Sequence, residues 1–133
     1  MYIIIKHYYP HKNICYNTYM NTLDNLKKSK FRSSFHLKDK DILYIHDKGL
    51  SVIKDHAYKF ISERLKPDKI INDGKQTPYK GHPIFIAQHA CACCCRGCLY
   101  KWHKIGKNRA LTEQEVDNIV NLLMNWIENE LHK

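Results

Sequence analysis

Long apolar runs are missing from this chain of 133 residues, and their absence excludes two classes of protein. The run from Ile3 to Ile5 is too short for the core of a secretory signal peptide, and no small-residue cleavage site follows it. No stretch reaches the roughly 20 apolar residues that a membrane-spanning helix needs. We therefore expect a cytoplasmic protein that makes no contact with a membrane.

Well-separated cysteines, which a disulfide framework needs, are also missing. Five of the six cysteines lie between Cys91 and Cys98. Neighbours such as Cys93, Cys94 and Cys95 cannot easily pair with one another, because a disulfide requires a suitable separation of the two Cβ atoms. In a reducing compartment, clustered cysteines more often bind a metal ion. Buried free cysteines, which behave as small apolar side chains, are the plain alternative.

Acidic residues are scarce relative to basic ones. The chain has 13 acidic and 22 basic residues, and its formal net charge is +9. This excess suits an anionic partner such as nucleic acid, a nucleotide or another phosphorylated ligand. A simple surplus of lysine on a soluble protein explains the same numbers, because the lysines are scattered and form no long tract. The composition carries no signal of the oligomeric state.

The first 19 residues differ from the rest of the chain. They contain no acidic residue and show neither helical nor strand periodicity. We interpret residues 1–19 as a disordered extension or a mis-assigned start, with Met20 as the natural first residue. Residues 20–133 are then long enough to form a single domain.

From Met20 onward, apolar residues recur with helical spacing, which predicts one all-α domain of about five helices. Phe31 and Phe35 are expected to anchor their segment in the core. Local signals mark the ends of several helices: Gly49 as a stop, Pro83 at a first helical position after His82, and a Thr112–Glu115 capping box. The expected helical segments are 21–30, 38–47, 50–65, 84–90, 99–103 and the stretch that follows Thr112.

The segment from His89 to His103 has the composition of a metal site. Cys95 and Cys98 form a Cys-x-x-Cys pair whose thiolates can face one ion, and Gly97 relieves the turn between them. With His103, this pair matches the first three ligands of a zinc knuckle. The fourth knuckle position, 108, holds an asparagine, so the fourth ligand must come from elsewhere.

The best candidates for the fourth ligand are His89 and Cys94, with His82 and His56 as further options. Cys94 adjoins another ligand, which strains simultaneous coordination of one ion. Four ligands would close a structural site, whereas three ligands and a water would leave a catalytic one. Soft thiolates favour Zn²⁺, with an iron–sulfur cluster or thiol redox chemistry at the Cys-x-x-Cys pair as alternatives.

The loop over residues 66–82 is the longest turn-rich stretch, and it lies directly before the cysteines. The candidate anion contacts of this region are Lys75, Thr77, Lys80 and Arg96. His82 and Asp73 are candidate catalytic groups, as a general acid or base or as an orienting carboxylate. A plain connecting loop, in which Asp73 makes turn hydrogen bonds and His82 caps a helix, is the alternative.

Two functions follow from these patterns. The first is a zinc-stabilised binding module that contacts phosphate on nucleic acid or a nucleotide through its basic loop, with Arg109 as a further contact. The second is a metal-dependent hydrolase in which Asp73 or His82 assists a metal-bound water. The sequence lacks a Walker loop, a His-Glu-x-x-His motif and the zinc-deaminase pattern, which disfavours those three chemistries.

The chain contains a series of distinctive short motifs, each present once: Phe31-Arg-Ser-Ser-Phe35, Asn72-Asp-Gly-Lys-Gln-Thr-Pro, Gly81-His-Pro, Gln88-His89, Cys94-Cys-Arg-Gly-Cys98 and Lys101-Trp-His103. Over residues 20–131 the chain resembles a family of small bacterial proteins known as domain of unknown function 4186. The family pattern implies a set of five site residues: His89, Cys94, Cys95, Cys98 and His103. Positions 91 and 93 are commonly not cysteine there, which lowers both as ligands. The resemblance implies no activity.

Overall fold

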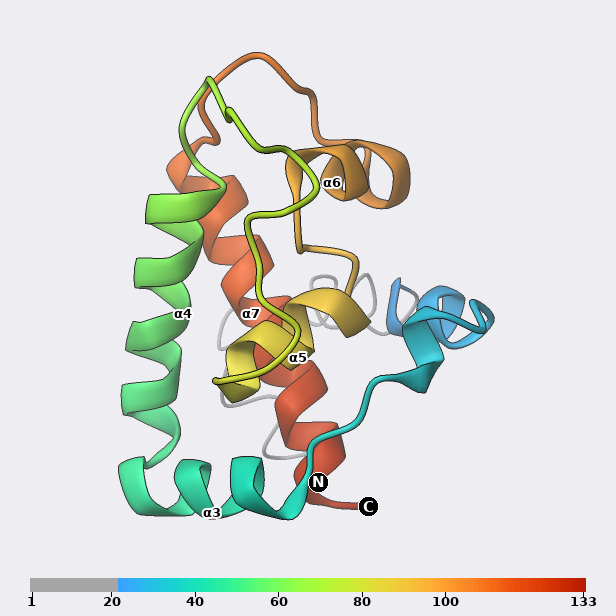
Figure 1. Cartoon of the computed structure of the whole chain (residues 1–133), viewed down its shortest axis with the longest axis vertical. Helices are drawn as coiled ribbons and strands as arrows, with labels where there is room; N and C mark the ends of the chain where they lie inside the picture. The colour runs from blue at the N-terminus through green and yellow to red at the C-terminus, as the bar shows by residue number, and fades with distance from the viewer. Residues whose placement is uncertain (1–21) are drawn as a thin grey trace.

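The computed structural model describes residues 22–133, and every regular element in that range is a helix (Figure 1). The predicted all-α class is therefore confirmed, whereas the interpretation of residues 1–19 lies outside the described residues. A helical segment over 22–27 comes first. The elements that follow are the 3-10 helix η1 (Arg32–Ser34), α3 (Asp39–Lys48), α4 (Leu50–Arg64), α5 (Pro83–Ala90), α6 (Arg96–His103) and α7 (Glu113–Leu131).

The last helix, α7, forms the centre of the core. It packs against both α4 and α5, and Figure 1 shows it running behind α5 and beside α4. Its buried face includes Val116, Val120, Leu123 and Ile127, which recur at helical spacing. Full burial of each such side chain stabilises the fold by roughly 1.5–3 kcal/mol. The helix begins with the predicted capping box, so this long, strongly amphipathic element was fully visible in the sequence.

A glycine separates α3 from α4. Gly49 has a φ of +86°, a conformation that L side chains rarely adopt, and it ends α3 as predicted. After it, α4 buries Ile53, Ala57 and Ile61, one residue per turn, against the core. Within residues 22–133 no helix is both long and apolar enough to cross a membrane.

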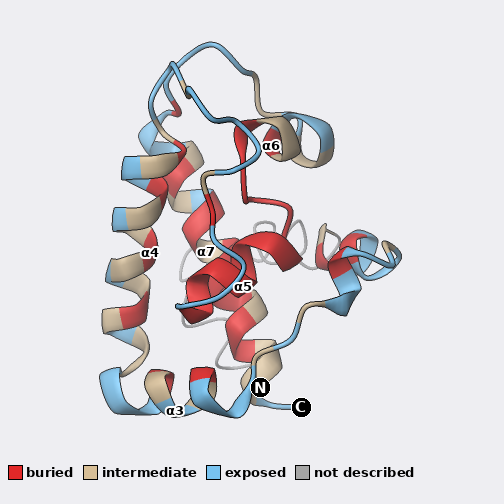
Figure 2. Cartoon of the chain, in the orientation of Figure 1, coloured by how far each residue is buried: buried red, intermediate tan, exposed pale blue. Residues whose placement is uncertain are grey.

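The short helix α5 lies inside the molecule. It contacts α3, α4, α7 and η1, and all eight of its residues are buried, which Figure 2 shows along its whole length. Pro83 occupies its first turn, as predicted, and His82 caps it, which was the alternative considered for that residue. Because α5 is buried on every side, its end delivers the following cysteines into the interior.

One core expectation is wrong. Phe31 is 51% exposed, because its neighbour Arg32 is the residue of this segment that turns inward, with an exposure of 8%. Phe35 is half-buried.

Candidate metal centre

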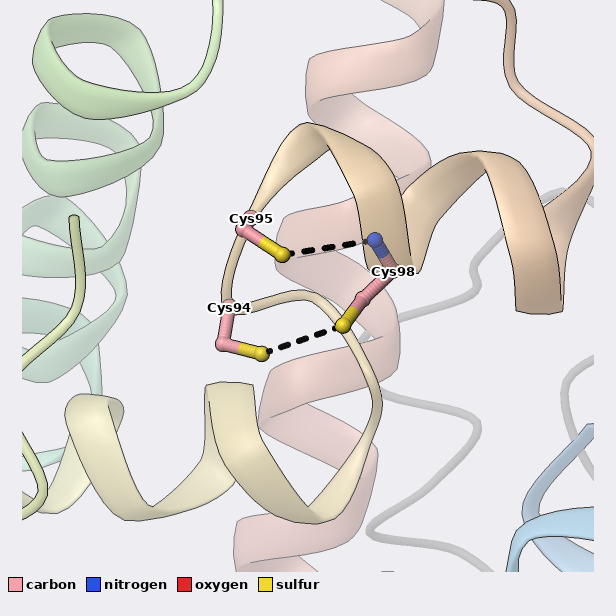
Figure 3. Close-up of side chains that lie close together, drawn as sticks. All are labelled: Cys94, Cys95 and Cys98. Carbon is pink, nitrogen blue, oxygen red and sulfur yellow. Dashed lines mark hydrogen bonds between the residues drawn. The ribbon is translucent and has the colours of Figure 1, made fainter. Parts of the chain in front are cut away.

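The cysteines gather where the chain turns from α5 into α6. Ala92 has a φ of +57°, and the N–H of Cys93 donates to the carbonyl of Gln88 at 2.8 Å, which reverses the chain direction after α5. Cys95 is the N-cap residue of α6, and Cys98 lies in the first turn of that helix. The side chains of Cys94 and Cys95, which precede the helix, and of Cys98, inside its first turn, therefore point toward one another (Figure 3).

Three sulfur atoms form the centre. The Sγ atoms of Cys94, Cys95 and Cys98 all lie within 4.8 Å of one another, and all three cysteines are free. The Cys94 and Cys98 sulfurs are 3.6 Å apart. That separation is far beyond a disulfide bond of about 2.05 Å. It is close to the roughly 3.8 Å between two thiolates that each lie about 2.3 Å from one tetrahedral zinc ion.

A buried arginine contacts two of these sulfurs. Arg32 Nη2 donates to the Cys98 Sγ at 3.1 Å, and Nη1 lies 3.6 Å from the Cys94 Sγ. Nη1 also donates to the carbonyl of His89 at 2.7 Å. Charge-assisted bonds of this kind stabilise an anionic sulfur. The guanidinium therefore favours negative charge on the sulfurs that it contacts.

The three thiols do not ionise alike. The thiols of Cys94 and Cys95 donate to Cys98 and, with Arg32, lower the pKa of Cys98 well below its ordinary value. Hydrogen bonding to Cys95 and Cys98 raises the pKa of Cys94. These contacts favour the thiolate form of Cys98, and a thiolate is the form of cysteine that binds metal ions.

His89 has a buried ring nitrogen with no hydrogen-bond partner, although it lies outside the three-sulfur group. Its Nε2 lies 3.1 Å from the carbonyl oxygens of both Thr77 and Pro78, which only accept, so this nitrogen carries the proton. Burial lowers the pKa of His89 and keeps the ring neutral. Its Nδ1 is then a buried lone pair without a partner. Metal-binding histidines commonly have this arrangement, in which a carbonyl fixes the tautomer.

The other predicted ligands lie elsewhere. His103 Nε2 lies 2.8 Å from the carbonyl of Cys91 and 3.6 Å from the Cys93 Sγ, outside the three-sulfur group. His56 and His82 contact each other, with Nδ1 and Nε2 at 3.0 Å, between α4 and the start of α5. The structure therefore brings together Cys94, Cys95 and Cys98, and none of His89, His103, His56 and His82 belongs to that group.

Comparison with known families supports the resemblance seen in the motifs. A family model described as Domain of unknown function (DUF4186) matches residues 20–128. The chain belongs to the DUF4186 family. No solved structure matches it. The match spans the three-sulfur centre and both of its flanking helices, and the description of the family names no activity.

Within the DUF4186 domain, the loop over 66–82 supports the centre from outside. The Asp73 carboxylate accepts from the N–H groups of Arg96 and Gly97, at 2.9 and 3.0 Å, and so completes the start of α6. Thr77 is buried, and its hydroxyl donates to the carbonyl of Cys94 at 2.8 Å. Both carboxylate oxygens of Asp73 are thus engaged, and Thr77 cannot reach an anion in solvent. Lys75 and Lys80 are exposed.

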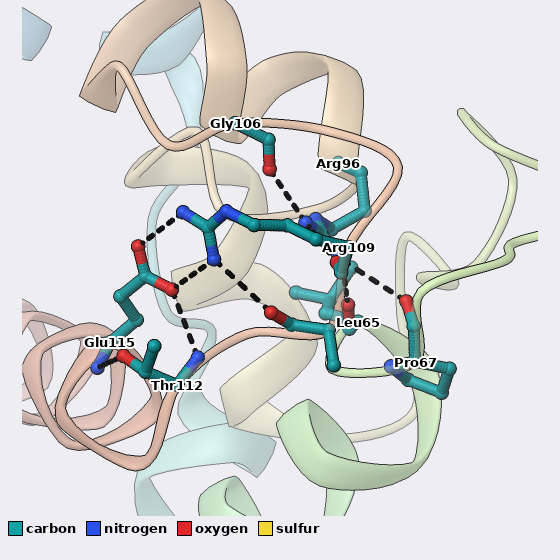
Figure 4. Close-up of polar contacts among 8 residues, drawn as sticks. Leu65, Pro67, Arg96, Gly106, Arg109, Thr112 and Glu115 are labelled. Carbon is teal, nitrogen blue, oxygen red and sulfur yellow. Dashed lines mark hydrogen bonds and ion pairs between the residues drawn. The ribbon is translucent and has the colours of Figure 1, made fainter.

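Arg96 has a role different from the one predicted. It is only 3% exposed, and its two Nη atoms donate to four backbone carbonyls (Figure 4). The acceptors are the carbonyls of Leu65, Pro67, Gly106 and Arg109, at 2.7–3.1 Å. Because these carbonyl oxygens occupy the Nη donors, the same donors are not free for the anion contact suggested by the sequence. Arg96 instead joins the end of α4 to the connection between α6 and α7.

Arg32 is the site residue that the sequence did not reveal. It lies 57 positions before His89 and 66 before Cys98, so no local spacing relates it to the cysteines. The available signal was its place in Phe31-Arg-Ser-Ser-Phe35, one of the motifs that carry the family resemblance.

Proposed function

We propose that this DUF4186 domain binds one Zn²⁺ ion through the thiolates of Cys94, Cys95 and Cys98, with His89 Nδ1 as the fourth ligand. The observation that carries the proposal is the gathering of three sulfurs within 4.8 Å of one another. The buried, unpartnered Nδ1 supports the fourth position, since a lone pair in the interior needs a partner.

The chemistry of the donors favours zinc over other ions. Three thiolates and an imidazole form a soft set that suits Zn²⁺ and not Mg²⁺ or Ca²⁺. An iron–sulfur cluster usually takes four cysteines, whereas only three gather in the part of the chain that the structure describes. Three thiolates around Zn²⁺ leave a net charge of about −1. The cation of Arg32 lies where it offsets that charge.

A structural role fits this ligand set better than hydrolysis. The ion would cross-link the end of α5, the turn after it and the first turn of α6, and closing such links contributes folding free energy. The bases considered for a hydrolase are engaged elsewhere: Asp73 caps α6, and both ring nitrogens of His82 have partners. Four protein ligands would also leave no coordination position for a reactive water.

Phosphate contact is the second part of the proposed function. Lys75 and Lys80 are the two residues of the predicted anion set that remain exposed, and both lie on the loop that packs beside the cysteines. The net charge of +9 supports an anionic partner, because it attracts phosphate over a distance of about one Debye length.

Elemental analysis of the purified full chain, together with its visible absorption spectrum, tests the metal part. We expect one zinc per chain and no colour. Iron with sulfide and visible absorbance would replace this proposal by an iron–sulfur protein. A folded chain that holds no metal, and whose unfolding temperature does not change with a chelator, would reject a metal centre altogether.

A further inference from the structure

Two stretches of chain without acidic residues meet beside the metal centre. Residues 25–38 contain four lysines and one arginine, and residues 74–112 contain five lysines and two arginines, with no aspartate or glutamate in either. The Arg32–Cys98 contact joins the two stretches. The acidic groups that touch these stretches from outside already have partners: Asp73 caps α6, and Glu130 accepts from the N–H of Leu37 and pairs with Lys133. Asp41 accepts from the N–H of Lys38, Asp24 pairs with Lys27, and Glu115 pairs with Arg109.

A row of aromatic rings runs along the junction of these stretches. Phe31 and Tyr79 are 51% and 62% exposed. Phe35 lies between them, its ring centroid 5.1 Å from that of Phe31 and 6.2 Å from that of Tyr79, and nearly parallel to the latter. Tyr79 stacks on the buried ring of His89 at 4.0 Å. Large parts of the Phe31 and Tyr79 side chains are thus exposed to solvent, although burial of such rings is normally favourable. The Arg32 guanidinium lies over the Phe31 ring, 5.0 Å from its centroid, which leaves the other face of that ring for a base.

Lysines flank both exposed rings. Lys30 precedes Phe31 and Lys80 follows Tyr79, and both lysines are exposed. Alternation of cations with exposed aromatic faces is the pattern of surfaces that bind single-stranded nucleic acid, where bases stack on rings and lysines contact phosphates. A duplex hides its base faces within the stack, so it could use only the charges of this surface.

We propose that the row Phe31–Phe35–Tyr79, flanked by Lys30 and Lys80, binds single-stranded nucleic acid. Bases stack on the exposed rings of Phe31 and Tyr79, and the lysines contact the adjoining phosphates. This inference deepens the phosphate-contacting part of the proposed function and rests on it, but it does not depend on the metal ion.

Fluorescence anisotropy of the full chain with a labelled oligothymidylate, and with its duplex with oligoadenylate, tests this surface. We expect tighter binding to the single strand, with an affinity that falls as salt rises. Phe31→Ala and Tyr79→Ala should each weaken binding about fivefold or more, since each removes one stacking platform. Tyr100→Ala, which removes a tyrosine that is 58% exposed but lies outside the row, should leave binding unchanged.

The charges have a matched pair of variants. Lys80→Ala should weaken binding and reduce its dependence on salt, whereas Lys40→Ala, an exposed lysine between two aspartates on α3, should change neither. Equal affinity for duplex and single strand with unaffected ring variants would overturn the proposal, and so would the absence of binding at low salt.

Zinc content, measured on the same samples, separates the two proposals. Binding by a zinc-free chain would reject the metal site and support the surface. A zinc-loaded chain that does not bind the oligonucleotide would support the metal site and reject the proposed surface. Because Tyr79 stacks on His89, Tyr79→Ala can disturb the metal centre. If Tyr79→Ala loses zinc, the test of base stacking rests on Phe31→Ala.

Discussion

The guanidinium of Arg32 donates to the sulfur of Cys98 at 3.1 Å, although the two residues are 66 positions apart. This bond connects the segment around η1 to the first turn of α6 through a charge-assisted contact. The same guanidinium holds the carbonyl of His89 at 2.7 Å. One side chain therefore contacts three proposed ligand residues, because its Nη1 also lies 3.6 Å from the Cys94 sulfur.

Removal of this guanidinium should weaken metal binding without removing a ligand. For Arg32→Ala we expect the affinity for zinc to fall about 10- to 100-fold, the usual effect of losing a group that supports metal ligands from outside. Competition with a chromophoric chelator measures the change. Lys30→Ala, an exposed lysine two positions earlier, is the control and should bind zinc as the parent does. An unchanged affinity in Arg32→Ala would mean that the thiolates need no compensating charge.

Substitutions should separate the proposed ligand cysteines from the cysteines beside them. Cys94→Ala or Cys98→Ala should lower zinc affinity by more than about 100-fold, a larger loss than an outer residue causes. Cys93→Ala should keep one metal per chain, because the Cys93 sulfur lies outside the three-sulfur group. Elemental analysis and the thiolate charge-transfer bands of the Co²⁺-loaded proteins give the readout. Loss of the metal in Cys93→Ala would move the site toward His103, which is 3.6 Å from that sulfur.

Arg96 should matter for stability and not for ligand binding. Arg96→Ala leaves four buried or half-buried carbonyls without their donor, so we expect the free energy of unfolding to fall by at least about 3 kcal/mol. Urea unfolding measures this change. The control is Arg109→Ala, which removes an exposed ion pair with Glu115 and should cost much less stability than Arg96→Ala. Equal effects of the two variants would contradict the role assigned to Arg96.

The His82 cap should make stability depend on pH. Burial, and then the neighbouring His56, lower the pKa of His82 to about 4, from an ordinary value of 6.5. Between these two pH values, His82 is protonated in the unfolded chain but stays neutral in the folded chain. The free energy of unfolding should therefore fall as the pH drops from 6.5 toward 4, by up to about 3 kcal/mol from this group.

Urea unfolding at neutral and acidic pH checks this dependence in three proteins. His82→Asn keeps a residue that can cap α5 but does not titrate, so its stability should vary less with pH than that of the parent. His46→Asn, a change at an exposed position on α3, should follow the parent. The thiolates titrate alike in all three proteins, so the comparison isolates His82. If the free energy of unfolding changed equally with pH in His82→Asn and in the parent, His82 would not be the source of the pH dependence.

Local signals allowed much of the fold to be predicted. The apolar period of α4 and α7, the stop at Gly49, the proline at the start of α5 and the capping box of α7 all appear in the structure where expected. Each of these signals lies within one or two turns of the residues it affects. Element type and many element ends could therefore be read from neighbouring residues alone.

The members of the candidate site could be predicted only in part. The sequence by itself indicated a metal centre and named Cys94, Cys95 and Cys98 among its ligands, because their spacing around one helix start is local. Tertiary structure alone decided that Arg32 faces their sulfurs, that Asp73 caps α6 and that Arg96 is surrounded by carbonyls. These contacts join segments far apart in the chain. They follow from how the helices pack, and no spacing within a single segment encodes that packing.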